Sequence, residues 1–142
     1  MSGVFGICSH ANVSNGNAVN VTELAYYALF ALQHRGQESC GIAVCDGGVI
    51  RYIRDLGLVP EVFTADKIER LGKGIMALGH VQYATDGQHK NRSLAQPLVV
   101  RHSKGNMAVS LSGSLTNASE LRDMLEGEGA ILHTNGDAEI IS

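Results

Sequence analysis

Residues 26–39 read Tyr-Tyr-Ala-Leu-Phe-Ala-Leu-Gln-His-Arg-Gly-Gln-Glu-Ser, an apolar run that passes abruptly into a polar one. The run lies in a predicted helix over residues 21–34, with Asn20 as N-cap, Glu23 three positions later and Gly36 just past the end. Apolar residues occur nearly all round this helix. A helix of this kind is usually buried, so we expect it to be covered on more than one side.

Short apolar runs separated by glycine-rich turns flank this helix and predict an α+β domain. Residues 46–48, Asp-Gly-Gly, predict a hairpin between two apolar runs, because both glycines can adopt positive φ. The expected strands are residues 4–8, 40–45, 49–53, 74–83, 98–102, 107–111 and 130–133. Two further helices are expected at residues 66–71 and 118–126, and the first turn of another helix at residues 137–142. Asn117 and Glu120 are the expected capping pair of the helix at 118–126. Because the last turn has no continuation, we expect the domain to be truncated at its C-terminus.

Length and composition narrow the class of protein. The 142 residues fit one domain, and 44% hydrophobic residues exclude wholesale disorder. The 11 basic and 14 acidic residues give a net charge of −3 without a basic stripe, which argues against a nucleic-acid partner. No apolar run approaches the ~18–20 residues of a membrane span, and no signal peptide opens the chain. Three cysteines cannot all pair, so the expected location is the cytoplasm.

Six histidines and three cysteines raise the question of a metal site. Cys8 and His10 are too close in sequence for an ordinary pair of zinc ligands, and the chain holds no Cys-x-x-Cys or His-x-x-x-His motif. Cys40 and Cys45 lie five positions apart in one predicted strand, so they point to opposite faces. We expect reduced core thiols, no metal and no cofactor.

Three stretches together carry a family resemblance: residues 26–39, Gly-His-Val-Gln-Tyr-Ala-Thr at 79–85, and Gly-Ser-Leu-Thr-Asn at 113–117. With Gly-Val-Phe-Gly-Ile at 3–7, they resemble class II glutamine amidotransferase domains, in particular the glutaminase domain of the amidophosphoribosyltransferase family. The resemblance runs from residue 3 to residue 141. It implies a four-layer αββα sandwich of the N-terminal nucleophile hydrolase type, and a link to purine biosynthesis. Residues 1–142 would then be a partial type-2 glutamine amidotransferase domain.

The resemblance places Ser2 where the family has its nucleophilic cysteine, directly before Gly-Val-Phe-Gly-Ile. The family uses the free α-amine of that residue, with a pKa near ~8, as the base. Removal of Met1 would expose a serine with a free amine. The serine side chain is a weak nucleophile, because a hydroxyl is far less acidic than a thiol. The alternative is that Ser2 only fills the former position of the nucleophile. Cys8, on the first predicted strand, lies six residues after Ser2 and cannot replace it at the terminus.

Two positions match the groups that bind the α-carboxylate and α-amine of glutamine in the family. Gln82 matches the arginine of Gly-His-Val-Arg-Tyr, whose planar fork suits a carboxylate, but it brings no positive charge. Asp137 matches the acidic residue that holds the α-amine, and it can cap a helix N-terminus at the same time. Loss of a charge-assisted pair costs ~1.5–3 kcal/mol, so affinity would fall about tenfold to hundredfold.

The oxyanion hole of the family comes from a His-Asn-Gly-Asn-Leu stretch, which reads Leu-Ser-Gly-Ser-Leu at 111–115 in this chain. Gly113 keeps the backbone N–H donor, but Ser112 replaces the asparagine amide. Loss of one oxyanion donor typically costs ~10²–10³ in rate. The alternative is that Ser112 still donates through a water molecule.

Three further positions match residues near the active site of the family. Arg35 either orders the N-terminal residues or caps the C-terminus of the helix at 21–34 together with His34. Tyr83 and Thr85 match positions that line the pocket, and a purely structural role is the alternative for both.

These changes affect the nucleophile, the carboxylate-binding group and the oxyanion donor, whereas the stretches that form the scaffold still resemble the family. We therefore expect a pseudoenzyme with glutamine hydrolysis lost or severely weakened. Its role would be that of a folding, docking or regulatory module, as a homo-oligomer or in association with a complete amidotransferase. The alternatives are a slow N-terminal serine amidohydrolase and a module that senses a small molecule through the remaining pocket, either glutamine or a related amino acid, or a nucleotide.

Overall fold

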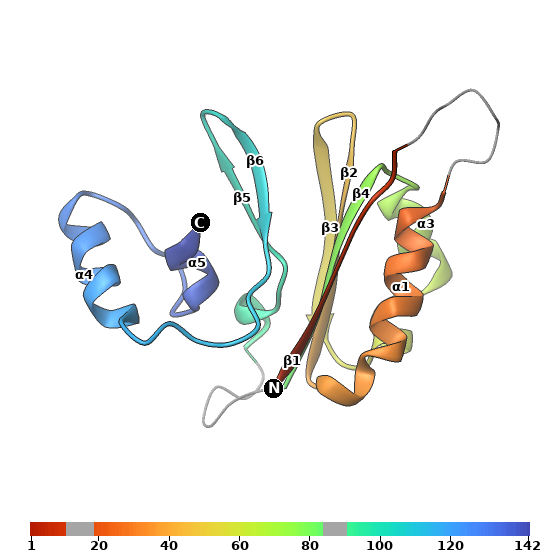
Figure 1. The fold of residues 1–142 in the computed structure, drawn as a ribbon, viewed down its shortest axis with the longest axis horizontal. Coiled ribbons are helices and arrows are strands. Elements are labelled where there is room, and N and C mark those ends of the chain that lie inside the picture. Colours follow the sequence, from red (N-terminus) through yellow and green to blue (C-terminus); the bar gives the residue numbers. More distant parts are fainter. Residues whose placement is uncertain (11–18, 84–90) are drawn as a thin grey trace.

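The computed structural model describes residues 1–10, 19–83 and 91–142. The elements are β1 (Ser2–Cys8), α1 (Val21–Ala31), β2 (Ser39–Asp46), β3 (Val49–Leu56), α2 (Val59–Val62), α3 (Ala65–Leu71), β4 (Met76–Gln82), β5 (Leu98–His102), β6 (Gly105–Val109), α4 (Ala118–Gly127) and α5 (Asp137–Ile141). Figure 1 shows them in layers, with α1 and α3 on one side of a sheet, the β5–β6 hairpin on its other side and α4 and α5 beyond the hairpin. The predicted αββα sandwich is therefore confirmed.

The first sheet has the strand order β1-β4-β2-β3, and every pair in it is antiparallel. Gln82 at the end of β4 lies between Ser2 on β1 and Ser39 on β2 in the register. The predicted hairpin between β2 and β3 is confirmed, since Gly47 and Gly48 have φ of 55° and 81°. The sheet therefore brings three polar residues from distant parts of the sequence to one end.

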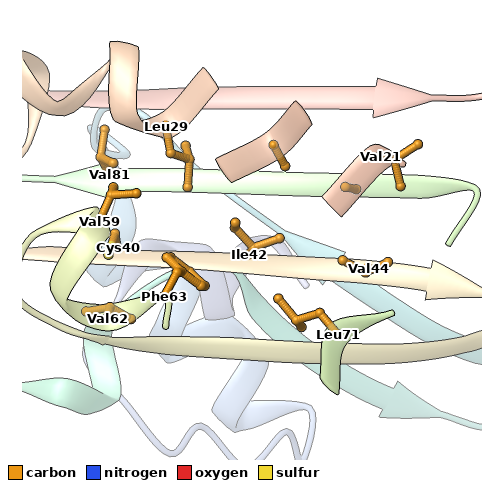
Figure 2. Close-up of a cluster of buried hydrophobic side chains, with 12 residues drawn as sticks. Val21, Leu29, Cys40, Ile42, Val44, Val59, Val62, Phe63, Leu71 and Val81 are labelled. Atoms are coloured by element: carbon orange, nitrogen blue, oxygen red, sulfur yellow. The ribbon is translucent and has the colours of Figure 1, made fainter. Parts of the chain in front are cut away.

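Helix α1 packs its small and branched side chains on the outer face of this sheet. Its predicted start is confirmed, because the Asn20 side chain accepts a hydrogen bond from the backbone N–H of Glu23 at 3.2 Å. Leu29 is fully buried and lies directly over Gly79 of β4, where an added Cβ would come within 2.9 Å of the leucine. Figure 2 shows Leu29 and Val21 of α1 above side chains of β2 and β4 in the main hydrophobic core.

The outer face of α1 is exposed, which corrects the expectation that the helix is covered on more than one side. Leu24, Tyr27 and Phe30 are 42%, 58% and 56% exposed. The reason is that α1 belongs to an outer layer of the sandwich, so only one of its faces meets the sheet. Apolar composition all round a helix does not by itself show which faces have a neighbour.

The predicted helix over residues 21–34 ends earlier, at Ala31, and a 3₁₀ turn follows at Gln33–Arg35. Gly36 has an extended φ of −165°, so it does not form a left-handed helix cap. A Cβ at this position would lie 2.3 Å from the backbone nitrogen of Gln82. Gly36 is thus required by the close approach of the chain to β4 rather than by its conformation.

The second sheet is the β5–β6 hairpin, in which His102 faces Gly105. The predicted hairpin is confirmed, but β6 begins at Gly105 rather than at residue 107, because the turn consists of only two residues. Gly105 has a φ of 132°, which this tight connection uses. Strand β6 contacts β3 of the first sheet.

The C-terminal part of the structure departs most from expectation. Residues 130–133 form no strand; instead the backbone N–H groups of His133 and Thr134 donate to the carboxylate of Glu139, at 2.7 and 2.6 Å. The predicted capping pair of α4 is not formed, since Asn117 makes no side-chain cap bond, and the helix continues through Gly127. The short helix α2 was not predicted. Among the described helices, none is long and apolar enough to cross a membrane.

Candidate active site

Ser2, Arg35 and Ser112 come together at the polar end of the first sheet. The Ser2 hydroxyl donates a hydrogen bond to the Ser112 hydroxyl at 2.7 Å, and the Ser2 side chain is buried. The Arg35 guanidinium donates from Nε to the carbonyl oxygen of Ser2 at 3.0 Å. This contact is the one that an ordering role of Arg35 at the N-terminal residues requires, while the His34 ring nitrogen Nδ1 lies 3.0 Å from the carbonyl oxygen of Ala31, as the alternative capping role requires. The role of Arg35 stays a prediction. Arg35 lies here because the neighbouring Gly36 lets the chain approach the backbone of β4 closely.

Met1 lies outside this cluster and is 76% exposed. Its carbonyl oxygen accepts a hydrogen bond from the backbone N–H of Tyr83 at 3.0 Å. While Met1 is present, the nitrogen of Ser2 is a peptide nitrogen and cannot act as a base. Exposure of Met1 leaves it open to removal.

A cavity of about 200 Å³ lies beside the serine pair. Gln82, Gly113 and Asp137, three of the predicted site residues, line it together. Ser2 and Ser112 are not among its lining residues, and they adjoin it through the neighbouring Gln82 in the register and Gly113 in the sequence. The structure thus places two of the predicted binding residues, Gln82 and Asp137, at one cavity with the predicted oxyanion residue Gly113, and it places the predicted nucleophile at the side of that cavity.

Gln82 and Asp137 both line this cavity, but only the Asp137 side chain already accepts a described hydrogen bond. The side-chain oxygen of Gln82 is buried and has no partner among the described residues. One carboxylate oxygen of Asp137 accepts from the backbone N–H of Leu115 at 2.7 Å, which ties α5 to the segment after Gly113. Gly136, and not Asp137, is the N-cap of α5, so the predicted capping role of Asp137 is corrected. An unpartnered buried acceptor next to a carboxylate favours a ligand that donates hydrogen bonds.

The predicted oxyanion residue Gly113 lies at the cavity, whereas the one predicted pocket residue that the structure describes does not line it. Gly113 has a φ of 131°, a conformation that favours glycine, and the space beside it is open. Tyr83 is 37% exposed and is not among the residues that line the cavity. Thr85 lies outside the described residues.

His80 is a buried residue of the site that the sequence did not single out. Its Nε2 lies 3.2 Å from the carbonyl oxygen of Leu111, and its Nδ1 has no partner among the described residues. The Gln96 side chain accepts from the backbone N–H of Leu111 at 2.6 Å. These two contacts fix the start of the 111–115 segment against the sheet. Burial lowers the pKa of His80 from 6.5 to about 4, so the ring is neutral at pH 7.

We expect the free energy of unfolding to fall as the pH is lowered from 6.5 to about 4. Above pH 6.5 the ring is neutral in both states. Below it the unfolded chain binds a proton that the folded chain excludes until about pH 4, which removes up to about 3 kcal/mol of stability. The measurement is urea unfolding at several pH values. His80→Gln flattens this dependence, whereas His102→Gln, at an exposed position, leaves it unchanged; an unaltered slope in His80→Gln contradicts the assignment.

The cysteines take no part in the serine cluster. Burial raises the pKa of Cys40 to about 12, which makes it an inert core thiol. Cys8 pairs with Met76, at the end of the sheet opposite to Ser2. All three cysteines are free. In the described part of the chain, no group of three or more metal-ligating side chains comes together.

Comparison with known proteins gives a consistent set of relatives. No protein-family model matches the chain. The amidophosphoribosyltransferase of Methanocaldococcus jannaschii is 44% identical over 142 residues, which is 100% of this chain and 28% of the relative. That of Archaeoglobus fulgidus is 44% identical over 136 residues, which is 96% of this chain and 29% of the relative. That of Bacillus subtilis is 38% identical over 141 residues, which is 99% of this chain and 28% of the relative.

Two solved structures agree with these relatives. The allosteric regulatory enzyme of purine biosynthesis superposes with a TM-score of 0.86 at 37% identity, over 99% of this chain and 28% of that one. The glutamine phosphoribosylpyrophosphate amidotransferase of B. subtilis, complexed with ADP and GMP, gives a TM-score of 0.83 at 36% identity, over the same shares. The chain thus spans a little more than a quarter of the length of the proteins that it matches.

Proposed function

Because the chain belongs to the amidophosphoribosyltransferase family, as its N-terminal glutaminase domain, we propose that it keeps a glutamine-binding cavity but has lost most or all glutamine hydrolysis. The relatives link it to purine biosynthesis. The observation that carries the proposal is the 2.7 Å hydrogen bond between the hydroxyls of Ser2 and Ser112. It joins the position of the nucleophile to that of the oxyanion donor, and neither side chain is the group that the chemistry needs.

The serine pair is poorly suited to attack an amide. Each hydroxyl is a far weaker acid than a thiol, whose pKa is ~8.5, so neither forms a reactive anion near neutral pH. A serine nucleophile needs a base, and while Met1 is present the nitrogen of Ser2 is a peptide nitrogen. The described side-chain partners of Ser2 are not bases either, since they are the Ser112 hydroxyl and the Arg35 guanidinium at the Ser2 carbonyl oxygen. The Ser112 side chain also lacks the amide N–H that would stabilise an oxyanion.

The cavity beside the pair offers groups that suit a ligand. Asp137 presents a carboxylate to it, and Gln82 presents a buried acceptor without a partner. Both accept hydrogen bonds from an ammonium group. A domain with these properties binds glutamine without consuming it and serves as a sensing or docking module. The partner that we propose for this role is a complete amidotransferase or a second copy of the chain.

A second function, slow serine amidohydrolysis, is favoured by the exposure of Met1. Removal of Met1 would give Ser2 a free α-amine in place of its peptide nitrogen. The mass of the intact purified protein distinguishes the two functions. A retained Met1 rules out the hydrolase, because the amine that would act as the base is then on the wrong residue.

Calorimetric titration with glutamine tests the binding part of the proposal. We expect saturable binding that Asp137→Asn weakens about tenfold or more, because the variant loses the charge that attracts the ammonium group. Asn at this position can still accept the hydrogen bond from Leu115. Asp123→Asn, at an exposed position of α4, is the matched control and leaves the affinity unchanged. Absence of saturable binding by the unmodified chain contradicts a surviving glutamine site.

A further inference from the structure

Arg54 brings a positive charge to the same cavity, from a strand that the site has not involved so far. It lies on β3 directly opposite Gly41 of β2, and Gly41 in turn pairs with His80 of β4. Residues directly opposite in antiparallel strands share a face, so Arg54 lies on the face that carries His80 and Gln82. Arg54 and Gln82 both line the cavity of about 200 Å³.

The guanidinium of Arg54 is held in place by backbone carbonyls. Its Nη1 donates to the carbonyl oxygen of Ala95 at 2.7 Å and to that of Pro97 at 3.3 Å. Arg54 forms no ion pair with a carboxylate in the described part of the chain, and the hydrogen bonds that its guanidinium makes there go to backbone carbonyls. A guanidinium has five N–H donors, and these two bonds use only one nitrogen. Donors therefore remain for a ligand.

The neighbouring backbone is shaped around this side chain. A Cβ at Gly41 would lie 2.2 Å from the carbonyl oxygen of Gln96 and 2.8 Å from the Cβ of Arg54. Only glycine at position 41 lets the segment of residues 95–97 approach the sheet closely enough for its carbonyl oxygens to accept hydrogen bonds from the guanidinium. The position of Arg54 is thus fixed by the fold and does not depend on a flexible surface side chain.

The cavity consequently combines groups of both charges. Arg54 is the cation, Asp137 is an anion with only one oxygen in a described hydrogen bond, and Gln82 contributes an unpartnered oxygen. The second carboxylate of the lining, that of Glu139, already accepts hydrogen bonds from the backbone N–H groups of His133 and Thr134. Such a set suits a small molecule that carries a carboxylate and an ammonium group together. The fork of arginine matches a carboxylate, and an ammonium group satisfies the two acceptors.

We propose that Arg54 binds the α-carboxylate of an amino acid ligand of glutamine size, in place of the cation that position 82 lacks. The α-ammonium group of the ligand binds Asp137 and Gln82, and its side-chain amide extends toward Gly113. This assignment rests on the proposed function, because it identifies the groups that hold the ligand in the same cavity.

The test compares glutamine with 4-aminobutanamide, which is glutamine without its α-carboxylate. The unmodified chain binds glutamine about tenfold to hundredfold more tightly than 4-aminobutanamide. In Arg54→Gln this preference disappears, while in Arg51→Gln, an exposed arginine of the same strand, it is kept. Because both ligands are compared on the same variant, a general weakening of the cavity does not change the preference.

The outcomes separate this inference from the proposed function. If the unmodified chain binds neither ligand, the proposed function fails and the inference fails with it. If glutamine is bound and Arg54→Gln keeps the full preference, the inference alone is overturned. Should Arg54→Gln fail to fold, Arg54→Lys keeps a cation without the planar fork and retains a reduced preference; an undiminished preference there also overturns the inference.

Discussion

Replacing Ser2 with Cys and Ser112 with Asn together is expected to raise glutamine hydrolysis by ~10³-fold or more. Recovery of one oxyanion donor is worth ~10²–10³ in rate, and a thiolate nucleophile adds to it. The structure favours this result because the two positions are already in contact, with the hydroxyls 2.7 Å apart. Steady-state ammonia release, with the mass of the protein checked for loss of Met1, is the measurement.

Control variants identify the source of any gain. Ser2→Ala in the presence of Ser112→Asn remains inactive, because it has no nucleophile. Gln82→Arg, added to the double variant, acts on KM rather than on kcat, since it places a second cation beside the cavity that Arg54 already lines. A double variant no faster than the unmodified chain contradicts the view that these two positions limit the rate.

Gly36→Ala is expected to destabilise the fold by about 3 kcal/mol or more, or to prevent folding. The new Cβ would lie 2.3 Å from the backbone nitrogen of Gln82 and 2.5 Å from the carbonyl carbon of Val81. Both are backbone atoms of β4 and cannot rotate away. Urea unfolding measures the loss.

Gly127→Ala is the matched control for this prediction. Gly127 is the last residue of α4, and nothing lies within 4 Å of an added Cβ. Alanine there is expected to stabilise the helix by up to ~1 kcal/mol, because it restricts the unfolded chain. Equal stability of the two variants would show that Gly36 does not act through close packing.

The elements that were predicted correctly carry their signals within a few residues. The start of α1 depends on Asn20 and on the backbone of Glu23, three positions away. The β2–β3 turn depends on two adjacent glycines with positive φ. Local hydrogen bonds and backbone conformations of this kind are encoded by the residues that form them.

The errors arose where distant parts of the chain decide the outcome. Gly36 was expected to end the helix, but it lies against the backbone of β4, a close approach that no local pattern reveals. Residues 130–133 were expected to form a strand from their apolar character, but their backbone N–H groups are satisfied in part by Glu139. The role of Arg54 depends on strand register and on the segment of residues 95–97, so the sequence alone did not suggest it.

The candidate site was predicted largely through family resemblance. That resemblance named Gln82, Gly113 and Asp137, and the structure places all three at one cavity. It also named Ser2 and Ser112, which are in hydrogen-bond contact. The role of each residue in binding or catalysis is a separate question, which the variants above address.

Ammonia release from glutamine by the purified chain, with Met1 removed so that Ser2 carries a free amine, tests the central proposal most directly. We predict binding of glutamine without ammonia release above that of the Ser2→Ala variant. Turnover of ~1 s⁻¹ or faster, which is typical of enzymes, would contradict the proposed loss of hydrolysis.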